Sequence, residues 1–104
     1  STLLAQEPVN AEEQKKMVIS VNDSFFKLYP NPATKGFTLE LEAYDDQEMI
    51  VLEIHSIMGK RMLYKELPAV PEQYVGLQEL SPGIYLVRVM QGNQTGVERI
   101  IKQN

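Results

Sequence analysis

The chain has 104 residues, no cysteine and a formal net charge of −4, and 43% of its residues are hydrophobic. This size suits one domain with a single two-layer core. The lack of cysteine excludes a disulfide framework and a thiolate metal site, and the acidic balance argues against nucleic acid as a partner. No apolar run reaches the roughly 20 residues that a membrane helix requires, so no membrane insertion is expected.

Residues 1–22 are rich in Gln, Glu, Asn and Lys, and we interpret them as a polar linker. Within them, the apolar segment Met17–Val21 could form an extra edge strand, or exchange with a neighbouring molecule to give a homodimer. The chain starts at Ser1 without the basic-then-apolar pattern of a secretory leader, so we expect any export signal upstream.

The domain, expected over residues 23–104, contains a stiff turn made by Tyr29, Pro30, Asn31 and Pro32. Each proline fixes its own φ and restricts the residue before it to extended geometry. Gly36 then opens a strand in which apolar and polar side chains alternate. The turn therefore predicts a strand with a rigid start.

Short segments with the same alternation continue along the chain, separated by turn residues at intervals of about 8–12 residues. Gly59 is placed to close a tight hairpin with a positive φ. The spacing predicts an all-β fold, an immunoglobulin-like antiparallel β-sandwich of about seven strands in a Greek key. We expect the strands at residues 25–29, 36–42, 49–57, 61–66, 74–77, 83–90 and 96–102.

The segment from Leu80 to Tyr85 has the spacing of a tyrosine corner, in which the tyrosine hydroxyl hydrogen-bonds the backbone a few residues upstream. Leu80 is expected to fill the core beneath the corner, and Tyr85 to point inward. Gly83 is expected to permit the turn, and a positive φ there would make larger residues costly. The motif favours a sandwich over a barrel.

No set of residues composes an active site, so we expect a non-enzymatic domain without a cofactor or metal. His55 is the only histidine, and neither a cysteine nor a serine in a nucleophile context accompanies it. Asp45, Asp46 and Glu48 offer oxygen ligands but lack the spacing of a calcium loop, which favours an ordinary acidic turn. The glycosylation sequence at residues 93–95 is interpreted as a hairpin turn.

Four segments stand in a definite order along the chain: Leu28–Ala33, Leu52–Lys60, Leu80–Val89 and Val97–Lys102. Together they resemble the type A C-terminal sorting domain of the type IX secretion system of Bacteroidetes, the Por secretion system C-terminal domain family. The resemblance covers residues 28–102.

The resemblance implies an address label for a cargo domain upstream in the same chain. Such a protein would pass through the periplasm and leave by the type IX translocon. A sortase-like cysteine peptidase would then remove the label at the outer membrane, and the cargo would stay on the cell surface or be secreted. The residues implied in recognition lie on the last two strands: Gly83, Tyr85, Val97, Glu98, Ile100, Ile101 and Lys102.

The last strand is expected to present an accessible end or an unpaired edge to the translocon. Val97 and Ile101 would pack on one face while Glu98 and Lys102 project, with Ile100 facing away from Val97. The alternative function is an immunoglobulin-like accessory module that binds carbohydrate or protein, and a third is a spacer domain. Because a sorting domain is expected to end its polypeptide, segments that run close to the end of the sequence favour sorting.

Overall fold

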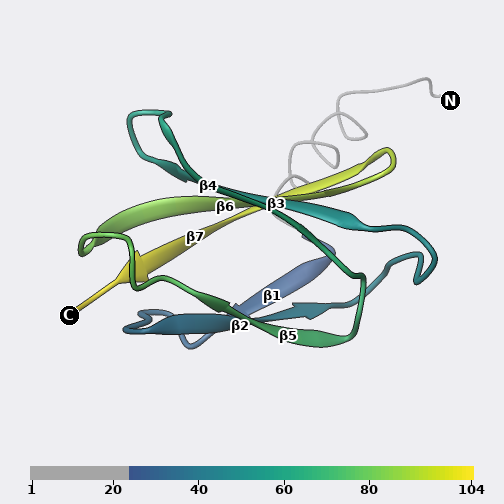
Figure 1. Cartoon of the computed structure of the whole chain (residues 1–104), viewed down its shortest axis with the longest axis horizontal. Coiled ribbons are helices and arrows are strands. Elements are labelled where there is room, and N and C mark those ends of the chain that lie inside the picture. Colours follow the sequence, from purple (N-terminus) through teal and green to yellow (C-terminus); the bar gives the residue numbers. More distant parts are fainter. Residues whose placement is uncertain (1–23) are drawn as a thin grey trace, which may run out of the picture.

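The computed structural model describes residues 24–104, and within them it is all-β (Figure 1). The prediction of an extra strand at Met17–Val21 lies outside these residues. The strands are β1 (Phe26–Tyr29), β2 (Gly36–Leu41), β3 (Ile50–Ser56), β4 (Arg61–Leu67), β5 (Glu72–Gly76), β6 (Gly83–Gln91) and β7 (Gln94–Lys102).

The strands form two antiparallel sheets that lie face to face (Figure 1). One sheet has the order β1-β2-β5 and the other the order β4-β3-β6-β7. The chain changes sheet between β2 and β3, between β4 and β5, and between β5 and β6. This arrangement confirms the predicted immunoglobulin-like sandwich. No helix in the described part of the chain is long and apolar enough to span a membrane.

The core fills the space between the two sheets, because each strand presents its apolar side chains with a period of two. In β3, for example, Ile50, Leu52 and Ile54 are fully buried, whereas Val51 and Glu53 between them are partly exposed. Burial of one such aliphatic side chain contributes about 1.5–3 kcal/mol. The largest fully buried side chains are Phe26, Phe37, Leu39, Ile50, Leu52, Ile54, Leu77, Val87, Val89 and Ile100.

Two strands begin earlier than the sequence pattern predicted. β5 starts at Glu72 because its first two residues pair with Glu40 and Leu39 of β2. β7 starts at Gln94 because Gly92, with a φ of 57°, closes a tight hairpin with β6. Pairing with a neighbouring strand therefore extends both strands into residues whose own sequence pattern does not predict a strand.

Candidate recognition site at the last strand

The strand that the sequence singled out for recognition, β7, forms one edge of the four-stranded sheet. On one side it pairs with β6 along its whole length, from Gln94 opposite Gln91 to Lys102 opposite Gly83. Its other side faces β1 and the turn that follows β1. At that side Ser24 Oγ donates a hydrogen bond to the carbonyl of Val97 (3.3 Å).

The turn after β1 covers the outer edge of β7 near its end. Asn31 Nδ2 donates to the carbonyl of Arg99 (2.7 Å), and Asn31 Oδ1 accepts from the amide of Ile101 (3.0 Å). The amide of Ala33 then donates to the carbonyl of Ile101 (2.8 Å), and the amide of Gln103 donates to the carbonyl of Ala33 (2.7 Å). We call these four hydrogen bonds the latch. They join the first turn of the domain to its last strand.

The sequence explains why an asparagine side chain takes part. Pro30 and Pro32 have no backbone N–H to offer to a neighbouring strand. The carboxamide of Asn31 carries a donor and an acceptor side by side, as a peptide unit does, and so replaces the missing backbone pairing. Both the Tyr29–Pro30 and the Asn31–Pro32 peptide bonds are cis. The hydroxyl of Tyr29 donates to Glu72 Oε2 (3.2 Å) and connects the same turn to β5.

The orientation of β7 differs in part from the prediction. Ile100 is fully buried and faces away from Val97, as predicted. However, Glu98 and Lys102 lie half-buried on the side of Ile100, so the prediction that they project while Val97 and Ile101 pack is wrong. Val97 is 38% exposed on the outer face. Adjacent isoleucines at the end of the strand allow either orientation, and only packing against the other sheet selects one.

The tyrosine corner is present as predicted. The hydroxyl of Tyr85 donates to the carbonyl of Ser81 (2.6 Å). Tyr85 and Leu80 are both 6% exposed, so they belong to the core beneath the corner. The resemblance implied Tyr85 and Ile100 in recognition, but both are buried, so a partner of the folded domain cannot contact them. Their contribution is to hold β6 and β7 in place.

The glycines of the motifs act in different ways. Gly59 has a φ of 90° in the turn between β3 and β4, which confirms the prediction. Gly83 has no positive φ, and a Cβ there would lie 3.7 Å from the ring of Tyr85, so the suggested backbone strain is absent. A Cβ on Gly36 would collide with the carbonyl oxygen of Val75. Gly36 is therefore required by a close approach of β2 to β5.

A charged cluster occupies the outer face of β3. His55 Nε2 lies 2.9 Å from Glu53 Oε1, while guanidinium nitrogens of Arg61 and Arg88 lie 3.3 and 3.8 Å from the same carboxylate. The hydrogen bond with His55, assisted by Arg61, lowers the pKa of Glu53 below its usual value. His55 thus lies in a surface ion-pair cluster.

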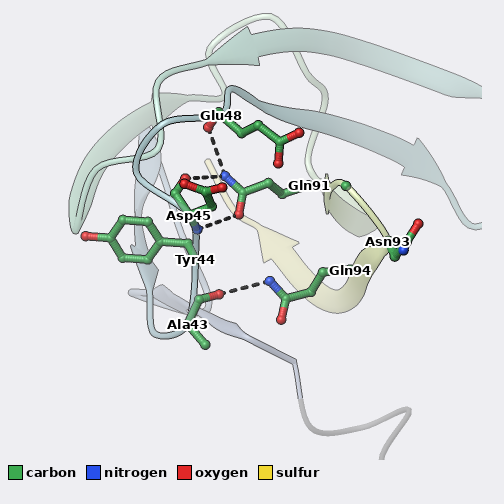
Figure 2. A pocket seen from close by; sticks show the side chains of 8 residues that line it. Ala43, Tyr44, Asp45, Glu48, Gln91, Asn93 and Gln94 are labelled. Carbon is green, nitrogen blue, oxygen red and sulfur yellow. Dashed lines mark hydrogen bonds between the residues drawn. The ribbon is translucent and has the colours of Figure 1, made fainter.

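Figure 2 shows a hollow between the β2–β3 loop and the β6–β7 hairpin. The side chain of Gln91, only 6% exposed, holds the loop there. Its Nε2 donates to the carbonyls of Asp45 (2.7 Å) and Glu48 (2.8 Å), and its Oε1 accepts from the amide of Asp45 (2.8 Å). Gln94 Nε2 donates to the carbonyl of Ala43 (3.0 Å). The side-chain amides of Gln91 and Gln94 are thus used in hydrogen bonds that hold the β2–β3 loop against the β6–β7 hairpin.

The acidic turn has no metal-site geometry. The carboxylate of Asp45 accepts a hydrogen bond from the amide of Gln47 (2.9 Å), as in an Asx turn. Over residues 24–104, no group of three or more His, Cys, Asp or Glu side chains could hold a metal ion.

The fold and the latch together define a small β-sandwich whose first turn is tied to its last strand. A family described as "Secretion system C-terminal sorting domain" matches residues 27–103, from β1 to the end of β7. The chain belongs to this family, as the resemblance of the four ordered segments indicated. No significant match was found among curated proteins.

Domains of this family are the C-terminal sorting signals of type IX secretion cargo. The domain therefore interacts with the type IX secretion machinery on behalf of a cargo upstream in the same chain. It directs export across the outer membrane, to the cell surface or to the exterior.

Proposed function

We propose that the type IX translocon reads this domain in its folded form, at β7 and the latch, after the protein has entered the periplasm. A sortase-like cysteine peptidase then removes the domain, which has no catalytic activity of its own. The observation that carries this proposal is the latch, because it gives the end of β7 a fixed position relative to the start of the domain.

The latch also restricts how β7 can be read. A partner that adds a strand to a sheet edge must hydrogen-bond the outward N–H and C=O groups of that edge. The carbonyl of Arg99 and both backbone groups of Ile101 already bond to Asn31 and Ala33. The translocon therefore recognises the end of β7 through outward side chains such as those of Val97, Arg99 and Ile101.

The experiment fuses residues 1–104 to a periplasmic reporter in a host that carries the secretion system. Surface delivery is compared for the wild type, Asn31→Ala and the control Gln73→Ala, which also loses a side-chain amide bond to the backbone but lies on β5, outside β7 and the latch. Wild type and Gln73→Ala should reach the surface. Asn31→Ala should accumulate in the periplasm, in a folded form that resists protease.

Two outcomes would contradict the proposal at different points. If the wild-type fusion stays in the periplasm, although the reporter is known to be exportable, the sorting function itself is refuted. If Asn31→Ala is delivered as efficiently as the wild type, the translocon does not read the latch.

Carbohydrate binding, the alternative function, has little support from the positions of the tyrosines. Tyr64 and Tyr74 are 46% and 61% exposed, but they lie on β4 and β5, which belong to different sheets. The neighbouring Leu63 and Val75 pack into the core, so the two tyrosines point outward from opposite faces of the sandwich and do not form one stacking platform. Tyr44 is half-buried and packs against the core.

We further propose that Met17–Val21 mediates strand exchange between two molecules. Light scattering on residues 1–104 and on residues 23–104 tests this idea. The longer chain should show dimers and the shorter one only monomers, and two monomeric samples would refute it.

A further inference from the structure

The outer face of the four-stranded sheet contains a hollow of about 200 Å³, which we call the outer groove. It lies where the turn after β3 meets the solvent-facing side chains of β3, β6 and β7. Leu86 and Val97 are each 38% exposed and Ile57 is 67% exposed, so the groove offers apolar surface to a partner. The lining residues are His55, Ser56, Ile57, Gly59, Leu86, Arg88 and Val97.

The size of the groove limits what can occupy it. Sites for drug-sized small molecules usually have about 300–1,000 Å³, whereas a hollow of roughly 150 Å³ accepts a group as large as benzene. A volume of about 200 Å³ therefore suits one aliphatic or aromatic side chain. A side chain delivered by a protein partner fits better than a free ligand.

The charge around the groove is opposite to that of the whole chain, which has a formal net charge of −4. Arg88 lines the groove with its side chain 48% exposed, and Arg99 stands directly opposite Leu86 in the strand register. Arg61, 54% exposed, lies beyond β3. The carboxylate of Glu53, 12% exposed, already contacts Arg61 and Arg88. The exposed guanidinium groups complement a carboxylate on the partner.

A second copy of the chain does not meet this requirement. A two-fold interface brings the same patch of both molecules together. Here it would bring the Arg88 and Arg99 side chains of both copies into one interface, and this gathering of like charge opposes association. A different protein that carries a carboxylate at its contact surface meets the requirement better.

We propose that the outer groove receives an aliphatic or aromatic side chain of a translocon protein, with a neighbouring carboxylate that pairs with Arg88 or Arg99. This inference rests on the proposed function and adds a contact surface to it. Val97 belongs both to the groove and to β7. One partner could therefore contact the groove and the last strand at the same time.

Variants of residues 1–104 fused to the exportable reporter test the proposal in the same host. Leu86→Ser removes the apolar wall, Arg88→Glu reverses the charge, and Arg88→Lys keeps it. Tyr74→Ser is the control, because Tyr74 is exposed on the other sheet. Binding of each purified chain to purified translocon is measured alongside surface delivery.

Leu86→Ser and Arg88→Glu should weaken translocon binding about tenfold or more, since each removes contacts made only in the complex. Both should remain folded and accumulate in the periplasm, whereas Arg88→Lys and Tyr74→Ser should be delivered. If Leu86→Ser fails to fold, the comparison of Arg88→Glu with Arg88→Lys still tests the groove. The Arg88 side chain is half exposed, so both substitutions should leave the domain folded.

The outcomes that overturn the inference are distinct from failure of the sorting function. Delivery and binding of Leu86→Ser and Arg88→Glu at wild-type levels would exclude the outer groove while sorting stands. Equal loss in Arg88→Glu and Arg88→Lys would exclude the carboxylate. Periplasmic retention of the wild type itself would refute sorting, and the groove contact with it.

Discussion

Replacing Asn31 with alanine removes two of the four hydrogen bonds of the latch, those at 2.7 and 3.0 Å to Arg99 and Ile101. An internal hydrogen bond contributes about 0.5–1.5 kcal/mol, so the pair could contribute about 1–3 kcal/mol. Because the site is exposed, water can replace part of each bond, and we expect a loss of about 1–1.5 kcal/mol in the free energy of unfolding. For a domain of this size that lowers Tm by roughly 4–12 °C.

Hydrogen exchange distinguishes the latch from a general loss of stability. In the wild type the amides of Ile101 and Gln103 donate to Asn31 Oδ1 and to the carbonyl of Ala33. If Asn31→Ala lets the end of β7 open locally, both amides should exchange about tenfold faster, since 1.4 kcal/mol corresponds to a factor of ten. Amides at the centre of β3 should change only as far as global stability does. Unchanged exchange at Ile101 together with an unchanged Tm would refute the reasoning.

Three further substitutions test separate parts of the fold. Tyr85→Phe should lose about 0.5–1.5 kcal/mol in denaturant unfolding, because one internal hydrogen bond to Ser81 is removed, and wild-type stability would argue against the corner. Gly96→Ala should cost about 1–3 kcal/mol, since its Cβ would lie 2.8 Å from the ring of Phe26, and a neutral result in thermal melts would show that β1 can move away. Glu53→Gln should cost about 1 kcal/mol or less at pH 7. Because the pKa of Glu53 is lowered in the folded state, its contribution to stability is complete above the ordinary value of 4.5 and is lost as the pH falls through the folded-state pKa. The Tm values of wild type and Glu53→Gln should therefore converge as the pH is lowered. A difference in Tm that stays constant with pH would contradict this.

The strands and the corner follow from local sequence, whereas the latch does not. Alternation of period two is a property of neighbouring residues, and it predicts strands such as β2 and β3 well. The bonds of Asn31 reach residues 68 and 70 positions away, so no local pattern shows them. The available signal is the asparagine itself, a side chain able to imitate a peptide unit between two residues that lack an N–H. The outward direction of Val97 was beyond prediction for a related reason, because it depends on which isoleucine the opposite sheet accepts.

The latch has a consequence for the order in which the protein is made. A ribosome completes the Pro-Asn-Pro turn some seventy residues before it reaches Arg99 and Ile101, the residues of β7 to which Asn31 bonds. While the chain is still being synthesised, or when it is cut short before β7, the turn has nothing to close upon. Closure therefore reports that translation has passed the whole of the cargo and the whole of the label. A secretion system that accepts only domains with the latch formed would therefore export only fully synthesised cargo, without contacting the cargo itself.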